Sequence, residues 1–501
     1  MRNDTILPSH RTVSIVFMRK LNRSLYLYII IVVEGYIVLS TELLAIRQTI
    51  PVVGSGTDTV SIIIAAVLMP LAFGYQSGGR FRPRRFFSEF ITIRKKLLFN
   101  ILISALILLP GLSYVFTLYF FNAMTETGIH NRLAQTAIYC AFFIVIPVYL
   151  LGQTIPLVSN YFSKERLSRM TGRMLFFSTL GSFMGAVFST LVLMSTIGVH
   201  HTASLVFILL ACLVILLSKN KLSEYVILSF FICAFALMAN SNALMASFDI
   251  VKNNQYNTIM VKTIGAGNRN LYLNNNNSSM YNDRGQKHPY IEFTEQVALL
   301  PIQPPDYQGP PKEILVIGAG GFTFGHEDRY NNYTFVDIDK DLKKIAEDYI
   351  LKEKLGPNKS FKPVPARAFL YNTDKKYDII FLDVFISGYN TPEHLVTREF
   401  FQQIKGALND KGLLISNFIA SPNFNNTYSR TLDNTVRSVF PHVSRHVIMN
   451  YYSLWSDDKS AKANVAYIYR HEKDYKTGSI YTDDKNTVFY DIPQKNQTSK
   501  R

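Results

Sequence analysis

The chain has 501 residues, of which 48% are hydrophobic and 18% charged, and its formal net charge is +16. The positive charge comes with no finger, helicase or ribonucleoprotein motif and much of it flanks apolar runs, so nucleic-acid binding is not expected. The cysteines Cys140, Cys212 and Cys233 all lie within apolar runs, which excludes a disulfide framework and a cysteine–histidine metal centre.

The first half of the chain is a series of long apolar runs. After a basic segment at 1–24, we expect a helical membrane domain over 25–241, because a helix needs roughly 20 apolar residues to cross about 30 Å of hydrocarbon. The first segment contains no short apolar run with a cleavage site, so no removable signal peptide is expected. About seven spans are expected, near 25–46, 59–77, 97–120, 135–157, 173–198, 202–218 and 223–241.

Basic residues beside the spans set the expected orientation. Arg11, Arg19 and Lys20 precede the first span, and further basic loops follow the second, fourth and sixth spans. The positive-inside rule then places the N-terminus in the cytoplasm, as in a multi-pass protein of the inner membrane. Seven spans would leave the C-terminal half outside the cytoplasm, whereas six or eight would place it inside.

The first expected span contains two acidic residues, Glu34 and Glu42. Carboxylates at membrane depth are costly and often functional, and eight residues separate two positions on roughly the same helix face. Two interpretations stay open, namely a substrate or proton site within the bundle and a structural carboxylate bonded to a neighbouring helix. In the fifth span, Gly181 and Gly185 predict a face of small residues for close helix packing.

From about residue 246 the chain alternates apolar strands with polar turns and charged helices, which is typical of an α/β domain. The strand Glu313–Ile317 runs directly into a turn that contains Gly318, Gly320 and Gly321. Glycines there permit a tight turn and let backbone N–H groups approach a ligand. No GxxxxGK[ST] motif is present, so the turn predicts an adenosyl cofactor or a dinucleotide and not P-loop chemistry.

Acidic residues follow two further strands of this half. Asp337 and Asp339 end the strand at 333–339, and Asp383 follows the apolar part of 375–385. Because the carboxyl ends of parallel strands meet at one edge of a sheet, these acids are expected to converge with the glycine turn. Asp337 is the candidate for the ribose hydroxyls, and Asp339 is expected to cap the following helix.

The alternation of strands and helices favours a Rossmann-like domain with a mostly parallel sheet, like that of S-adenosylmethionine-dependent methyltransferases. A third strand is expected within 362–370. We expect a small β-domain at 246–300, the Rossmann-like domain at 301–490 and a polar tail at 491–501.

Several motifs of this half resemble the spermidine synthase, or polyamine aminopropyltransferase, family over about residues 250–470. HPYIEF stands where the family has a Tyr-His-Glu motif, ILVIGAGG resembles its cofactor loop and VDID its ribose motif. YDIIFLD resembles the strand that carries the catalytic aspartate, and NTPEHLVTREFF the gate segment. TELLAIRQTIPVVGSG resembles the family's membrane-embedded subset, in which a multi-span domain is fused to the synthase-like domain, so the resemblance covers most of the chain.

The resemblance implies an enzyme that transfers an aminopropyl group from decarboxylated S-adenosylmethionine to an amine such as putrescine, without a metal. Asp383 would orient the attacking ammonium and accept its proton. The implied cofactor-binding residues are Gly318, Gly320, Gly321, Asp337 and Pro392, and the implied amine-binding residues are Tyr290 and Glu292. The expected partners are the lipid bilayer and a small amine, and homo-oligomerisation is left open. Because adenosyl compounds are cytoplasmic, an active domain would face the cytoplasm.

The chain also departs from the family pattern. Gly321 stands where the family has an acid, Ile291 replaces the histidine of Tyr-His-Glu, and Val364 and Pro365 replace a Gly-Asp pair; Ile386 lies near the place of a second acid. Three functions therefore stay open: a membrane-anchored aminopropyltransferase, a degenerate ligand-binding or sensor domain on a membrane bundle, and a transporter with an attached polyamine- or adenosyl-binding domain. A methyltransferase that uses S-adenosylmethionine is a further alternative on the same sheet.

Overall fold

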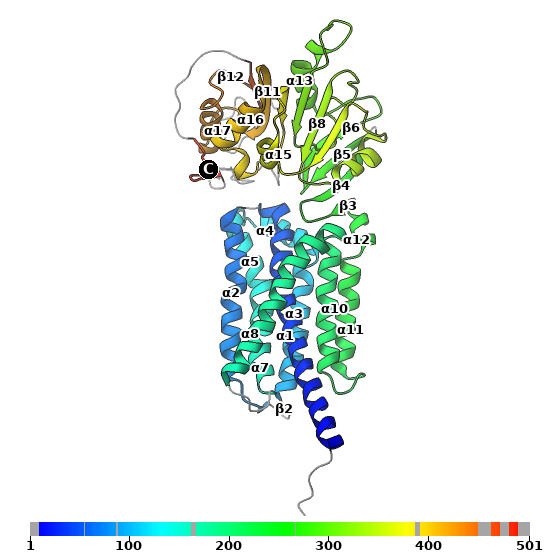
Figure 1. Ribbon diagram of the computed structural model, residues 1–501, viewed down its shortest axis with the longest axis vertical. Helices are drawn as coiled ribbons and strands as arrows, with labels where there is room; N and C mark the ends of the chain where they lie inside the picture. Colours follow the sequence, from blue (N-terminus) through cyan, green and yellow to red (C-terminus); the bar gives the residue numbers. More distant parts are fainter. Residues whose placement is uncertain are drawn as a thin grey trace, which may run out of the picture. The chain divides into compact units, whose positions relative to one another are not determined.

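The computed structural model describes residues 10–54, 56–86, 89–161, 167–265, 267–385, 391–448, 462–470 and 480–488. The chain divides into two compact units. The helical unit comprises most of the chain up to Leu244, and the α/β unit comprises chiefly the chain from Met245 onward. Figure 1 draws the helical unit in blue to green and the α/β unit in green to red.

Long apolar helices dominate the first half of the chain. A short antiparallel pair, β1 (Arg84–Phe86) and β2 (Glu89–Ile91), separates the second helix from the third. The helices are α1 (His10–Val53), α2 (Thr57–Arg80), α3 (Ile93–Gly111), α4 (Tyr114–Glu126), α5 (Arg132–Cys140), η1 (Ala141–Val145), α6 (Ile146–Gly152), α7 (Thr154–Ser159), α8 (Leu167–Val187), η2 (Phe188–Leu193), α9 (Met194–Thr196), α10 (Val199–Leu217), α11 (Glu224–Ala239) and α12 (Asn242–Ser247).

Six helices in the described part of the chain are long and apolar enough to cross a membrane. Helices α3 and α4 meet the same criterion only together, and they are bent by 68° where they join, so the number of spans is seven if the bent pair is one span. Each of the seven predicted apolar runs coincides with one of these helical segments. The number of crossings depends on the α3–α4 bend, and the crossing of a bilayer stays a prediction.

Close packing of α1 against α8 depends on glycine. A Cβ atom on Gly181 would lie 2.1 Å from the carbonyl oxygen of Val32, and one on Gly185 would lie 2.4 Å from that of Tyr36. Any larger side chain would push the two backbones apart. The small-residue face predicted at Gly181 and Gly185 is therefore confirmed as a helix-packing surface.

A seven-stranded sheet forms the centre of the α/β unit. Its order is β12-β13-β11-β10-β7-β8-β9; the strands from β11 to β9 are parallel, and β13 is antiparallel to both of its neighbours. This arrangement is the Rossmann-like sheet that the sequence predicts. The strands are β7 (Glu313–Ile317), β8 (Asn332–Asp337), β9 (Lys359–Pro363), β10 (Tyr377–Leu382), β11 (Leu408–Ala420), β12 (Val443–Ile448) and β13 (Ala463–Tyr469).

Helices cover both faces of this sheet, which explains why its strands are continuous apolar runs. Leu315 and Ile317 of β7 pack into a cluster with α16 and α17, whereas Ile314 and Val316 pack into a second cluster with α13 and α14. The helical segments are α13 (Pro289–Ala298), η3 (Leu300–Ile302), α14 (Leu342–Ile345), η4 (Ala346–Leu351), α15 (Ala366–Asn372), η5 (Glu393–Leu395), α16 (Arg398–Ala407) and α17 (Thr427–Arg437).

The third strand lies earlier than the sequence predicts. It was expected within 362–370, but β9 spans Lys359–Pro363 and the following residues form α15, with Pro365 at its N-cap. Proline fixes a backbone conformation suited to a helix start, and Ala-Arg-Ala-Phe-Leu then continues as a helix. The prediction was wrong because a short segment of mixed composition has no clear period.

A four-stranded antiparallel meander precedes the parallel sheet. It consists of β3 (Ile250–Asn253), β4 (Thr258–Ile264), β5 (Asn268–Leu273) and β6 (Asn276–Tyr281), and it belongs to the same compact unit as the large sheet. Asn274 and Asn275, between β5 and β6, have φ values of 49° and 67°. Asparagine tolerates this left-handed conformation, which a tight hairpin needs. The meander lies within the segment predicted as a small β-domain.

The strand order reverses between β7 and β10. From β7 the chain proceeds outward through β8 and β9, and it then returns to place β10 on the other side of β7. In open sheets of this kind, ligands bind beyond the carboxyl ends of the strands at such a reversal. Gly318 and Asp383 directly follow β7 and β10, so the fold places both residues at the expected ligand crevice.

Candidate active site

The ends of β7 and β10 approach each other closely at Gly318. The backbone N–H of Asp383 donates a 2.8 Å hydrogen bond to the carbonyl of Ile317. Gly318 has a φ of 93°, and a Cβ atom on it would lie 2.1 Å from the carbonyl oxygen of Asp383. Only glycine allows this turn and this contact together. The glycine turn and Asp383 are therefore side by side.

Asp383 is held by two side chains from other elements. The Tyr290 hydroxyl of α13 donates to Oδ2 at 3.0 Å, and Asn417 Nδ2 of β11 donates to Oδ1 at 2.9 Å. Burial raises the pKa of Asp383 to about 6, although both hydrogen bonds oppose the increase. The carboxyl group is therefore mostly ionised at pH 7 but protonates within reach of neutral pH, which suits a general base.

Tyr290 stays a neutral donor beside Asp383. Burial and the neighbouring carboxylate raise its pKa well above the ordinary value for tyrosine. Its hydroxyl oxygen also lies 3.1 Å from the carbonyl oxygen of Ser278 in β6. Tyr290 thus connects the meander, α13 and the end of β10 at one point.

Asn417 is a site residue that the sequence reasoning missed. Its side chain is buried in β11, and Nδ2 donates both to Asp383 and, at 3.1 Å, to Oδ1 of Asn464 in β13. Its Oδ1 atom is buried without a hydrogen-bond partner among the described residues. The available signal was an amide side chain within the apolar run LLISNFIA, on the strand that follows Asp383 in the sequence.

Asp337 lies at the glycine turn, as the sequence predicts. Its Oδ2 atom accepts a 3.0 Å hydrogen bond from the N–H of Ala319, and Oδ1 accepts one of 3.0 Å from the N–H of Asp339. Burial raises the pKa of Asp337 to about 6, and the two backbone hydrogen bonds oppose this increase. The carboxylate oxygens have further lone pairs, so this position is suited to ribose hydroxyls.

Asp339 has a second structural role besides the predicted one. The helix α14 begins at Leu342 with Asp341 at its N-cap, and Asp339 Oδ1 accepts a 3.1 Å hydrogen bond from the N–H of Asp341, so Asp339 caps the turn that leads into the helix. The buried Asp339 side chain accepts 2.8 Å hydrogen bonds from Nδ2 of both Asn254 and Asn257, which lie between β3 and β4. It fastens the meander to the parallel sheet.

The meander also packs directly on the glycine turn. The N–H of Gly321 donates a 2.8 Å hydrogen bond to Ser279 Oγ of β6, and a Cβ atom on Gly321 would lie 2.9 Å from the Cβ of Ser279. A Cβ atom on Gly320 would lie 2.8 Å from the same Oγ. Ser279 therefore fills the space next to Gly321, the position at which the resemblance described above implies an acid.

The remaining predicted site residues lie in different surroundings. Glu292 is two residues beyond Tyr290 in α13, and positions two apart do not share a helix face. It is exposed and accepts a 3.1 Å hydrogen bond from the N–H of Lys287. Pro392 is buried at the N-cap of η5, and its carbonyl accepts from Leu395 at 2.8 Å. Their roles stay predictions, and Ile386 lies outside the described residues.

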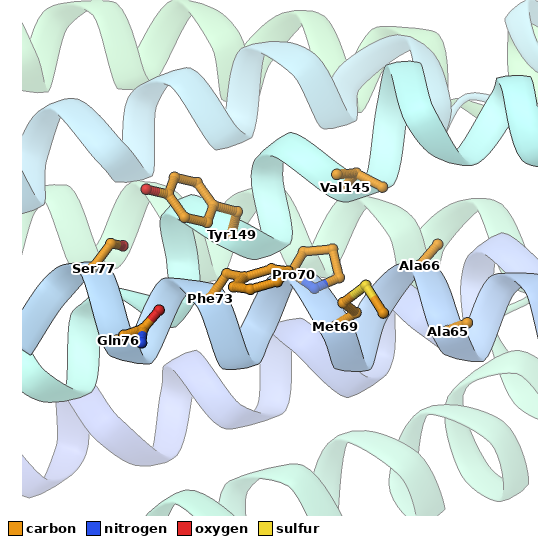
Figure 2. Close-up of a pocket in the computed structure, with 9 residues that line it drawn as sticks. All are labelled: Ala65, Ala66, Met69, Pro70, Phe73, Gln76, Ser77, Val145 and Tyr149. Carbon is orange, nitrogen blue, oxygen red and sulfur yellow. The ribbon is translucent and has the colours of Figure 1, made fainter.

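A cavity of about 550 Å³ lies in the helical unit, between α2 and the η1–α6 segment (Figure 2). Gln76, Ser77 and Tyr149 are grouped at one end, and the rest of the lining is apolar. No carboxylate and no histidine lines this cavity, so it lacks the groups of the Asp383 site. The lining residues are Ala65, Ala66, Met69, Pro70, Phe73, Gln76, Ser77, Val145 and Tyr149.

Comparisons of this chain with a family model and with curated proteins find the same kind of protein. Residues 293–463 match the family model of the spermine/spermidine synthase domain. A polyamine aminopropyltransferase from Saccharolobus solfataricus is 28% identical over 144 residues, which are 27% of this chain and 48% of the relative. One from Vibrio vulnificus is 32% identical over 159 residues, which are 30% of this chain and 49% of the relative.

Among solved structures, a probable spermidine synthase from Corynebacterium glutamicum is 19% identical, with 45% of this chain and 81% of that chain covered and a TM-score of 0.37. The chain spans about half the length of the curated relatives named above. The α/β unit carries a spermine/spermidine synthase domain, as the sequence motifs indicate.

Proposed function

We propose that the chain is a membrane-anchored aminopropyltransferase, which uses decarboxylated S-adenosylmethionine and an amine such as putrescine. The observation that carries this proposal is the Asp383 carboxyl group, which is partly buried, has a pKa raised to about 6 and is held by Tyr290 and Asn417 beside the glycine turn. The family match and the relatives named polyamine aminopropyltransferase support the reaction class.

The reaction requires an unprotonated amine, whereas aliphatic amines are mostly cationic at pH 7. In the proposed step, the ammonium group of the acceptor gives one proton to Asp383. The freed nitrogen lone pair forms a bond to the propyl carbon next to sulfur as the carbon–sulfur bond breaks. The sulfonium leaves as a neutral thioether, and the new secondary amine carries the positive charge. Tyr290 and Asn417 hold the carboxylate in position for the proton.

The cofactor would lie across the ends of β7 and β8. The turn at Gly318 and Gly320 would let the adenosyl moiety approach the backbone, and Asp337 would accept hydrogen bonds from the ribose hydroxyls. Pro392 is a further proposed cofactor contact. Gly321 supplies no carboxylate for the cofactor's amine, and this observation favours a second candidate function, a domain that binds an adenosyl ligand without turnover and serves as a sensor.

We expect the α/β unit to face the cytoplasm, where adenosyl compounds are made. With a cytoplasmic N-terminus, this location requires an even number of membrane crossings. The number is six if the bent pair of α3 and α4 does not cross the membrane and seven if it does, so this pair determines on which side the α/β unit lies. A reporter that is active only in the cytoplasm, fused after Arg501, should be active. Activity from a periplasmic reporter alone would contradict a cytoplasmic enzyme.

The direct test uses the full chain in lipid nanodiscs. Decarboxylated S-adenosylmethionine is offered with putrescine, spermidine or other amines, and the thioether product and the lengthened amine are measured by mass spectrometry. Formation of both products in equal amounts would support the transferase. Calorimetric binding of decarboxylated S-adenosylmethionine or methylthioadenosine without any product would instead support the sensor.

A further inference from the structure

The helix α1 lies in the interior of the helical unit. In its apolar window, 67% of the residues are buried, against 22–61% for the other five candidate spans. Three polar residues of this helix, Glu34, Thr41 and Gln48, have side chains that are at most 1% exposed. A buried polar side chain in a membrane helix normally has a partner, so each of these residues requires an explanation.

The three side chains follow one face of α1. They are spaced by seven residues, and positions seven apart differ by only about 20° around a helix. Fourteen residues of helix extend about 21 Å, which is much of the roughly 30 Å hydrocarbon thickness. Both carboxylate oxygens of Glu34, the hydroxyl oxygen of Thr41 and the amide oxygen of Gln48 are buried without a hydrogen-bond partner among the described residues.

The free atom of Gln48 is an acceptor and not a donor. Its Nε2 atom donates a 2.9 Å hydrogen bond to the carbonyl of Leu112, where α3 ends. This contact fixes which end of the amide is nitrogen, so the free end is Oε1. All the unpartnered atoms of this α1 face can therefore accept hydrogen bonds.

Other polar groups of α1 have partners. Ser189 Oγ of η2 lies 2.8 Å from Ser40 Oγ and donates a 2.9 Å hydrogen bond to the Tyr36 hydroxyl. Thr49 Oγ1 lies 3.0 Å from the carbonyl of Ala45. The bundle thus provides hydrogen bonds for neighbouring positions of the same helix. The acceptors at Glu34, Thr41 and Gln48 are exceptions on one face.

Glu34 has no basic partner within α1. Arg47 is thirteen residues farther along the helix, a distance of about 20 Å, so it cannot pair with Glu34. Tyr75 of α2 is close enough to interact electrostatically with Glu34, but it carries no positive charge and makes no hydrogen bond to it. Ionisation of a carboxyl group in such a place is costly, and a cation bound beside it would offset this cost.

The spacing of the acceptors decides which cation fits. Neighbouring members of the row are about 10 Å apart along the helix, whereas a metal ion needs its oxygen ligands gathered within about 2.6 Å of one centre. In the described part of the chain, no cluster of three histidine, cysteine or acidic residues could hold a metal ion. An ammonium group suits single acceptors, because it brings several N–H donors and a positive charge to each.

We propose that the helical unit binds small aliphatic ammonium ions at Glu34 and passes them along Thr41 and Gln48 through the bundle. Glu34 provides the counter-charge, and the two neutral residues accept N–H hydrogen bonds at successive levels. This transport activity goes beyond the proposed transferase and does not require it.

The test is amine counterflow with the full chain in liposomes. Vesicles loaded with unlabelled putrescine are diluted into a trace of radiolabelled putrescine, without any adenosyl compound, so that no transfer reaction contributes. The wild-type chain should accumulate label above protein-free vesicles. Glu34→Gln should reduce the initial rate at least tenfold, and Thr41→Val, which removes one acceptor at nearly constant volume, should reduce it several-fold.

A matched control is Glu224→Gln, because Glu224 is an exposed acid in the first turn of α11 in the same unit. This variant should exchange label at the wild-type rate. If Glu34→Gln does not purify as a single species, Thr41→Val alone decides the test. Wild-type rates in Glu34→Gln or Thr41→Val, or no counterflow by the wild-type chain, would overturn the proposal.

Discussion

A carboxyl group in each unit is removed from solvent, Glu34 completely and Asp383 in part, and the two groups have contrasting surroundings. Asp383 of the α/β unit receives hydrogen bonds from Tyr290 and Asn417, whereas Glu34 of the helical unit has no hydrogen-bond partner among the described residues. The partners of Asp383 fix its position and moderate the effect of burial on its pKa. This difference matches the two proposals, in which Asp383 is a positioned base and Glu34 is a counter-charge for a bound ammonium ion.

The largest expected effect is on turnover. Asp383→Asn preserves the shape of the side chain but removes the base, so aminopropyl transfer should fall by roughly 10²–10⁴-fold, the usual contribution of a positioned general base. Binding of the adenosyl cofactor should change little, as measured by calorimetry. Undiminished turnover would show that Asp383 is only a structural residue at the strand end, since asparagine fills such positions equally well.

A second prediction follows from the pKa of about 6 at Asp383. This value is raised above the ordinary one, so the carboxylate that accepts the proton is present above pH 6 and is lost as the pH falls below it. The rate kcat/KM should therefore decrease about tenfold per pH unit below pH 6. Asn417→Leu removes a hydrogen bond to the ionised Asp383 carboxylate, so it should raise the pKa of Asp383. The decrease in kcat/KM should then begin at a higher pH. If kcat/KM of Asn417→Leu decreases below the same pH as that of the wild type, the positioning role of Asn417 is contradicted.

The smallest of these effects concerns cofactor affinity. Asp337→Ala should remove the charge-assisted hydrogen bonds to ribose, which is a loss on the order of 1.5–3 kcal/mol, or about tenfold or more in Kd for an adenosyl ligand. Calorimetry with methylthioadenosine measures this change. Asp339→Ala is the comparison variant, and it should lower thermal stability because Asn257 loses the acceptor of its Nδ2 group and Asn254 keeps only its hydrogen bond to Asp341 among the two to acids. Equal affinity in Asp337→Ala and the wild type would exclude the ribose contact.

The local sequence pattern was sufficient to predict the strands that position the ligand crevice. The apolar runs before Gly318 and Asp383 could be predicted as strands because parallel strands are buried on both faces and are therefore apolar throughout. The ends of these strands converge because parallel strands of one sheet end at the same edge. The bend between α3 and α4 was harder to see. The run 97–120 is mostly apolar, and Pro110 and Gly111 were the local signal of a break.

Contacts between residues that are far apart in the sequence could not be predicted from the local sequence pattern. Asn417 reaches Asp383 from 34 residues away, and Asn254 reaches Asp339 from 85 residues away. Nothing near Asp339 in the sequence indicates that this residue also anchors another sheet. Tyr290 and Glu292 were assigned together, but the helix places them on different sides, so only the buried tyrosine contacts Asp383.

In the proposed function, Asp383 serves as the base in a transfer of the aminopropyl group. The most direct measurement is the amount of lengthened amine and methylthioadenosine that the full chain forms in nanodiscs from decarboxylated S-adenosylmethionine and putrescine, compared with Asp383→Asn. We expect equal amounts of both products from the wild type and at least a hundredfold less from the variant. Equal rates in the two proteins, or adenosyl binding by the wild type without product from any amine, would contradict it.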